Sequence, residues 1–187
     1  MITFERTFKY ALVREIFIHP RIWPYVSDDG SPAPDDYRVP EDPNVWYVLV
    51  LDVGEAGAEL LGCWTFHPHN LVCWEVHTCL LPVAWGDTGL EAGRAIIRWI
   101  WHNTPCRRLI TNVAITNRLA LHFARNAGLK EYGLNEKSWL KGGKLIDQVC
   151  LGISRPVGMP LVEPRKAPET HEKEGESLCL SSHSSLP

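Results

Sequence analysis

The spacing of apolar and polar residues in the first half of the chain predicts short strands. Residues 2–9 alternate between the two classes, which predicts a first strand. Residues 11–19 fit a short helix that ends at Pro20. Three apolar segments then follow one another through short turns: 45–52, 59–66 and 71–81. Such short links predict an antiparallel meander of three strands.

The pattern changes to helical spacing in the second half. Between Thr88 and Trp101, apolar residues recur three or four positions apart, as one buried helix face requires: Gly93, Ile96, Ile97 and Ile100. A strand is predicted over 108–116, and Asn117 suits the N-cap of a second helix. Its inward face is expected to comprise Leu119, Ala120, Phe123 and Ala127. Gly128 is expected to end this helix with a positive φ.

Two segments lack either periodicity. Residues 27–44 contain four prolines and five aspartates and are predicted to form a long loop, a kind of segment that is often functional. Lys141-Gly-Gly-Lys144 predicts the turn of a final hairpin. After Arg155 the chain becomes rich in Pro, Glu, Lys and Ser. We therefore interpret 1–155 as a single domain and 156–187 as a disordered polar tail.

Composition excludes several classes of function. The 187 residues include 19 basic and 22 acidic side chains, so no overall field favours nucleic acid or an anionic membrane. No apolar run is long enough to span a bilayer. The six cysteines form no CxxC pair, which favours buried free thiols over a disulfide framework. We expect a cytoplasmic protein with no nucleic-acid or membrane partner.

The order of elements between residues 73 and 155 resembles a known family. A strand, a glycine-bearing loop, a helix, a strand, an asparagine-capped helix and a hairpin follow in turn. This order is similar to the acyl-CoA-binding half of the GNAT acyltransferase superfamily. Asn117 and Gly128-Leu129 have the family's spacing, and four residues match the ribosomal-protein type of N-acetyltransferase: Trp85, Gly86, Glu91 and Ala92. The resemblance implies an α+β fold with a mixed, mostly antiparallel central sheet, helices on both faces and a splayed strand pair for acyl-CoA.

Several residues are candidates for binding the coenzyme. Backbone N–H groups at a helix start hold a pyrophosphate well, and the start predicted here comprises Trp85, Gly86, Asp87, Thr88 and Gly89. An ordinary strand-to-helix turn capped by Thr88 explains the same residues. Asn117 is either a simple cap or a hydrogen-bond partner of the pantetheine arm. The resemblance further places a thioester-polarising N–H at Cys79, Leu80 or Leu81, and Arg125 is a candidate partner of the 3′-phosphate.

Two polar residues on an apolar strand are candidates for catalysis. Glu75 and His77 are two positions apart and therefore share one face of the strand. Glu75 is the first candidate for the general base and His77 the second, although a structural Glu–His pair explains them equally well. His67-Pro-His69 lacks a third ligand nearby, so no metal site is predicted.

The resemblance implies an N-acetyltransferase that moves an acetyl group from acetyl-CoA to a primary amine. The acceptor, a small molecule or a protein terminus, is not identified by the sequence, and a homodimer is compatible with the fold. The loop is altered at Val83, Asp87 and Thr88, and Ala124 stands where the family usually has a Tyr that acts as the general acid. These departures favour an alternative, a weak or inactive scaffold with a binding or assembly role, for example in a bacteriophage. An enzyme that uses another acyl donor is a third hypothesis.

Overall fold

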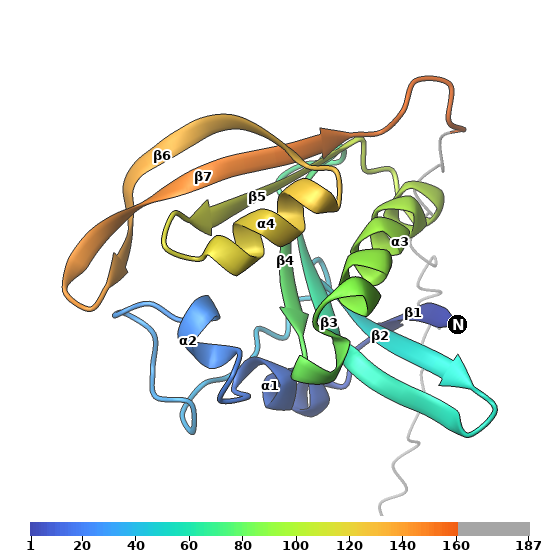
Figure 1. Ribbon diagram of the computed structural model, residues 1–187, viewed down its shortest axis with the longest axis horizontal. Coiled ribbons are helices and arrows are strands. Elements are labelled where there is room, and N and C mark those ends of the chain that lie inside the picture. Colours follow the sequence, from blue (N-terminus) through green and yellow to red (C-terminus); the bar gives the residue numbers. More distant parts are fainter. Residues whose placement is uncertain (161–187) are drawn as a thin grey trace, which may run out of the picture.

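The computed structural model describes residues 1–160. They form one sheet of seven strands in the order β1-β2-β3-β4-β5-β7-β6 (Figure 1). The strands are Ile2–Thr7 (β1), Trp46–Gly54 (β2), Gly57–Pro68 (β3), Cys73–Leu80 (β4), Arg108–Ala114 (β5), Lys130–Lys141 (β6) and Lys144–Ser154 (β7). Neighbouring strands are antiparallel except β4 and β5, which are parallel. The predicted meander and final hairpin are both confirmed.

Three helices of the described residues lie where the sequence pattern places them, with small shifts at their ends, whereas the short helix over 23–26 was not predicted. The helices are Tyr10–Phe17 (α1), Trp23–Val26 (α2), Asp87–Asn103 (α3) and Arg118–Asn126 (α4), with a 3₁₀ turn at Pro82–Ala84. The predicted cap of α4 is confirmed, because the Asn117 side chain accepts a hydrogen bond from the N–H of Ala120. Gly128 follows α4 with a φ of 105°, as expected.

The two faces of the sheet carry separate apolar cores. Since side chains alternate along a strand, neighbouring residues of β3 enter different cores. Trp64 and Phe66 pack with the buried faces of α3 and α4. Cys63, together with Tyr47 and Cys79, packs with α1 on the opposite face. Helices therefore cover both faces of the sheet, as predicted.

The strands β4 and β5 are paired over only a short distance. Their parallel pairing comprises Cys73 with Arg108, Trp74 with Leu109 and Glu75 with Ile110. Beyond that point the two strands diverge, as Figure 1 shows. On its other side β5 stays paired with β7 along its whole length, so the sheet opens only between β4 and β5. This gap is the predicted splayed strand pair.

One face prediction is wrong. Leu119 was expected to point inward from α4, but its side chain is 70% exposed. The buried residues of α4 are Leu121 and Ala124, with Ala127 just beyond the helix. These positions lie three residues apart, and Leu119 falls outside that stripe by about one residue's rotation of the helix.

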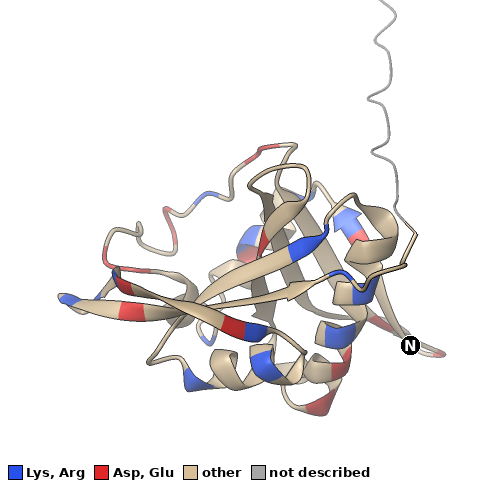
Figure 2. Cartoon of the chain, turned by 90° about the horizontal axis from the view of Figure 1, so that it is seen from above, with Lys and Arg blue, Asp and Glu red and all other residues tan. Residues whose placement is uncertain are grey.

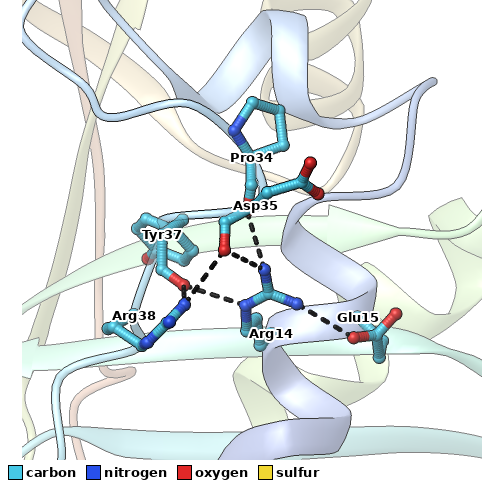
Figure 3. A network of polar contacts seen from close by, with 6 residues as sticks. All are labelled: Arg14, Glu15, Pro34, Asp35, Tyr37 and Arg38. Carbon is cyan, nitrogen blue, oxygen red and sulfur yellow. Dashed lines mark hydrogen bonds and ion pairs between the residues drawn. The ribbon is translucent and has the colours of Figure 1, made fainter.

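The loop over 27–44 is fixed to the rest of the molecule by two sets of hydrogen bonds. The first comes from Arg14 of α1, whose guanidinium donates to the carbonyls of Tyr37, Pro34 and Asp35 over 2.8–2.9 Å (Figure 3). Tyr47 also donates its hydroxyl proton to the carbonyl of Pro40. Although the loop has no regular structure, these bonds hold it against α1 and the sheet.

The second set joins the loop to the tip of the β6–β7 hairpin. The carboxylate of Asp29 accepts hydrogen bonds from the N–H groups of Gly142 and Gly143, at 2.8 and 2.7 Å. Lys141 donates its ammonium proton to the carbonyl of Ser27 at 2.6 Å. We call these three contacts the clasp. Segments more than 110 residues apart in sequence thus meet above the same face of the sheet.

Charges of both signs are interspersed along the chain (Figure 2). No helix within the described residues is long and apolar enough to cross a membrane. The predicted domain boundary at Arg155 comes directly after β7. Of the predicted polar tail, residues 161–187 lie outside the described part of the chain.

Candidate functional site

A cavity of about 580 Å³ extends from the β4–β5 gap to the face of the sheet covered by α1 and α2. Its walls come from the 27–44 loop, from the helices α1, α2, α3 and α4, and from the strands β2 to β7. Glu75, His77, Cys79 and Asn117 line it, and these are four of the residues that the sequence singled out. The residues from Leu80 to Gly89 and Arg125 lie outside its walls.

The hydrogen-bonding direction along β4 determines which backbone groups face the gap. The N–H of Leu81 donates to the carbonyl of Leu61. Because N–H groups of an antiparallel strand alternate in direction, the N–H of Cys79 also points towards β3. Those of Thr78 and Leu80 point the other way, towards β5, where pairing with β4 has already ended. Of the three predicted donors, only Leu80 therefore faces the gap.

The loop that begins α3 is built for close backbone approach. Gly86 is the N-cap with a φ of 95°, which favours glycine, and no cap comes from the side chain of Thr88. A Cβ at Gly89 would lie 2.5 Å from the carbonyl oxygen of Ala84, so this position also requires glycine. Both Asp87 and Thr88 are exposed. The first N–H groups of α3 have no partner within the helix, as at any helix start.

Trp85 connects this loop to two other segments. Its indole N–H donates to the carbonyl of Leu80 at 2.8 Å, at the end of β4. The guanidinium of Arg21 lies 4.8 Å from the centre of its ring. Arg21 is therefore a cation next to the start of α3, which sequence reasoning missed because it comes from the segment between α1 and α2. Arg125 instead forms an ion pair with Glu131.

Glu75 is held by three neighbours at the vertex of the gap. Asn112 of β5 donates to Glu75 Oε1 at 3.1 Å, and His69 Nε2 lies 3.0 Å from Oε2. His77 Nε2 is 3.9 Å from Oε1. Burial by itself would raise the pKa of Glu75, but His77 and the hydrogen bonds from Asn112 and His69 outweigh it. The pKa therefore lies below its ordinary value.

His77 differs from Glu75 in its exposure and in its charge at neutral pH. Its side chain is 45% exposed and forms part of the cavity wall. Burial lowers the pKa of His77 more than the carboxylate of Glu75 raises it. His67, whose ring centre is 5.2 Å from that of His77, has a lowered pKa for the same main reason. At neutral pH these two imidazoles are uncharged, so each has a nitrogen that can accept a proton.

Two further residues shape the site and were not singled out from the sequence. Thr65 of β3 is paired directly with His77 and lines the cavity, with 2% of its surface exposed. Gly62 has a φ of 146°, and a Cβ there would lie 2.3 Å from the carbonyl oxygen of Cys79. A sequence signal for Thr65 did exist: Thr65 and His67 are two positions apart on β3, in the strand next to Glu75 and His77.

The cysteine in the cavity wall is not a nucleophile. Burial raises the pKa of Cys79 to about 12, which keeps it a neutral thiol. The five cysteines of the described region are all free. Within residues 1–160, no group of three or more His, Cys, Asp or Glu side chains is arranged to hold a metal ion.

Comparison with known proteins identifies the fold. No protein-family model matches the sequence, and no curated protein matches it significantly. Solved structures do match. A spermidine N-acetyltransferase from Vibrio cholerae, in complex with CoA and spermine, has a TM-score of 0.66 at 15% identity, covering 82% of this chain and 95% of that one.

Two other matches are of similar quality. A ribosomal-protein-S5-alanine acetyltransferase from Vibrio fischeri has a TM-score of 0.63 at 13% identity, covering 85% of this chain and 94% of that one. A GNAT-family acetyltransferase from Bacillus anthracis has a TM-score of 0.64 at 18% identity, covering 82% and 94%. The chain thus has the fold of the GNAT acetyltransferases, as its resemblance to them predicted.

Proposed function

We propose that the protein is an N-acetyltransferase that moves an acetyl group from acetyl-CoA to a primary amine by direct transfer. One observation carries the proposal: the gap between β4 and β5 continues into the cavity that contains Glu75 and His77. An extended thiol-bearing arm laid in this gap would end beside two groups able to handle a proton. The neighbours of this fold are acetyltransferases, one of them in complex with CoA.

The residues around the gap fit a coenzyme A thioester. The free N–H groups at the start of α3, which follow the N-cap Gly86, suit the pyrophosphate. Arg21 supplies a nearby positive charge. Asn117 uses its Oδ1 as the cap and keeps its amide N–H₂ for a pantetheine carbonyl. The N–H of Leu80 is oriented to polarise the thioester carbonyl. The coenzyme supplies an activated acyl carbon. Arg125 stays a weaker candidate, because Glu131 already neutralises it.

We assign the general base to His77 and a positioning role to Glu75, which reverses the order that the sequence suggested. The lowered pKa of Glu75 and its three partners make it a poor proton acceptor near neutral pH. The neutral imidazole of His77 is more accessible from the cavity. It accepts the proton of the attacking amine directly or through one water, while the adjacent carboxylate stabilises the resulting imidazolium.

A second candidate function is a scaffold that no longer turns over substrate. Asp87 in the first turn of α3 favours it, because a carboxylate there repels a pyrophosphate. Ala124, buried in the cavity wall, favours it as well, because it provides no acid for the leaving thiolate. Three other hypotheses remain predictions: the use of another acyl donor, a homodimeric state and a cytoplasmic location. Light scattering of the purified protein would decide whether it is a dimer.

The experiment that tests the proposal is a thermal shift with acetyl-CoA, followed by release of free thiol in the presence of amines. A ligand at about 100 times its Kd adds roughly 2.7 kcal/mol to the free energy of unfolding. For a domain of this size we expect Tm to rise by about 5 °C or more. A shift without thiol release from any amine would favour the scaffold. The absence of a shift at millimolar acetyl-CoA would contradict the proposal.

A further inference from the structure

The hydroxyl of Thr65 has no hydrogen-bond partner in the described structure, although it is buried. It lies in a row across three strands, between Tyr47 of β2 and His77 of β4, on the face covered by α1 and α2. The hydroxyl of Tyr47 already donates to the carbonyl of Pro40. Thr65 therefore stands in the cavity wall, beside the proposed base, with its hydrogen-bonding capacity unused.

Leaving a buried hydroxyl without a partner is unfavourable, because it has lost its hydrogen bonds to water. Most buried polar groups in proteins are satisfied, so an exception calls for an explanation. A valine of the same shape would fill this position without that cost. Because Thr65 lines the cavity next to the proposed base, a substrate bound there is a candidate for the missing hydrogen-bond partner.

The surrounding walls indicate the charge of that substrate. Among the described residues that line the cavity, the charged side chains are acidic, Asp28 and Glu75, and none is lysine or arginine. His67 and His77 add no positive charge at neutral pH, since burial lowers the pKa of each. The remaining wall is rich in aromatic rings: Trp23, Tyr25, Tyr37 and Trp139. Acidic and aromatic surfaces both attract ammonium groups.

The clasp limits the size of the substrate. Asp28 and Ser31 of the loop line the cavity from one side, and Ser138 and Trp139 of β6 line it from the other. The bonds of Asp29 to Gly142 and Gly143 join these two walls. Walls joined in this way favour a small acceptor over a folded protein.

We propose that the acceptor is a small primary amine with a second amino group, and that Thr65 binds this second group. The inference rests on the proposed acetyl transfer and names its substrate class. The free amine nitrogen forms a bond to the acyl carbon and the C–S bond breaks. The amine proton passes to the imidazole of His77, and the released thiolate then takes up a proton from this imidazolium or from water. The second ammonium donates a hydrogen bond to Thr65 Oγ1, close to the carboxylate of Glu75.

The test compares two variants of Thr65 with two matched amines. Thr65→Val keeps the shape and removes the hydroxyl, whereas Thr65→Ser keeps the hydroxyl. The probes are 1,4-diaminobutane and n-butylamine, which differ in the second amino group, with an Ala-headed heptapeptide as a protein-terminus mimic. In the wild type we expect kcat/KM for the diamine to exceed that for butylamine about tenfold or more. Thr65→Val should abolish this preference and Thr65→Ser should keep it.

Two further readouts distinguish recognition from folding. Because Thr65→Val removes an unsatisfied hydroxyl, its Tm without ligand should equal or exceed that of the wild type. The affinity for acetyl-CoA should be unchanged in both variants. A loss of stability in Thr65→Val alone would show that the hydroxyl has a structural partner and would overturn the inference. A faster reaction of the peptide than of the diamine would overturn it too.

Binding without turnover separates this inference from the proposed function. If acetyl-CoA binds and amines are acetylated, but Thr65→Val leaves the diamine preference intact, only the inference fails. If no amine is acetylated, the diamine site is tested by the Tm shift that 1,4-diaminobutane produces without acetyl-CoA. A shift present in the wild type and lost in Thr65→Val supports the diamine site in a protein that is not an acetyltransferase. The absence of any shift overturns it.

Discussion

Two regions of the molecule are constructed differently. The coenzyme half comprises the β4–β5 gap with α3 and α4. The acceptor half comprises α1, α2, the 27–44 loop and the hairpin tip. The coenzyme half consists of regular elements, and its binding groups are mainly backbone N–H groups and a helix cap. The acceptor half depends on side chains that connect distant segments, such as Arg14 and Asp29. The backbone can thus serve a constant coenzyme, while exchangeable side chains define the acceptor.

The largest effect is expected where the two halves meet. His77→Gln should lower kcat by about 10²-fold or more, because it removes the proposed base, without weakening acetyl-CoA binding. The control is His102→Gln, because His102 is an exposed histidine of α3.

Glu75→Gln should lower kcat less and shift the acidic limb of the kcat–pH profile to lower pH, because the carboxylate raises the pKa of His77. If Glu75→Gln were the more damaging variant, the base would be Glu75.

The coenzyme half should be more sensitive to backbone changes. Gly62 belongs to β3 but lies directly against β4, the strand that borders the gap, and Gly62→Ala places a Cβ against the carbonyl oxygen of Cys79 in β4. It also forces a positive φ on a residue with a side chain. We expect the free energy of unfolding to fall by about 2–3 kcal/mol, together with weaker acetyl-CoA binding. Gly54→Ala, where a Cβ meets nothing within 4 Å, is the matched control. Equal melting curves for the two variants would contradict the close approach of β3 and β4.

The acceptor half should respond to a side-chain change instead. Arg14→Met removes the bonds that tie the loop to α1 but keeps an apolar stem (Figure 3). We expect a loss of about 1–2 kcal/mol in the free energy of unfolding and a several-fold higher KM for the amine, with the Kd of acetyl-CoA unchanged. Arg38→Met is the control, because the hydrogen bonds of Arg38 go to Asp35 and Tyr37 of its own loop. A change in acetyl-CoA affinity would show that the two halves are not separable.

The smallest expected effect is a pH dependence of stability from the histidines of the sheet face. The pKa of His67 and of His77 is lowered in the folded state, so the unfolded chain binds protons more readily. Stability should therefore decrease as the pH falls below about 6.5, the ordinary pKa of histidine. The low pKa of Glu75 adds a further loss at more acidic pH. In His67→Asn the fall of Tm between pH 7 and pH 5 should be shallower than in the wild type.

Local signals in the sequence were sufficient for much of the coenzyme half. The helical spacing before Trp101, the cap at Asn117 and the positive φ of Gly128 each depend on residues close in the chain. The one wrong face, that of Leu119, follows from the choice of stripe along a short helix, since apolar residues occur on two sides of it. The proposed roles of the site residues remain predictions from these patterns.

The acceptor half was predictable only as a long loop of unknown purpose. Its proline and aspartate content excluded regular structure but gave no partners. The contacts of Asp29 with Gly142 and Gly143 join residues 113 and 114 positions apart, and no local pattern encodes such a distance. The same holds for Arg21 beside Trp85 and for Asn112 beside Glu75.

The sequence by itself determined the succession of strands and longer helices along the chain, the meander, the N-cap at Asn117 and the face that Glu75 and His77 share, because each depends on spacing within one segment. Only the tertiary structure decided which backbone groups face the gap, which cation lies near α3 and which hydroxyl stays unpaired. These depend on strand pairing and on the meeting of distant segments, where register and packing orient each group.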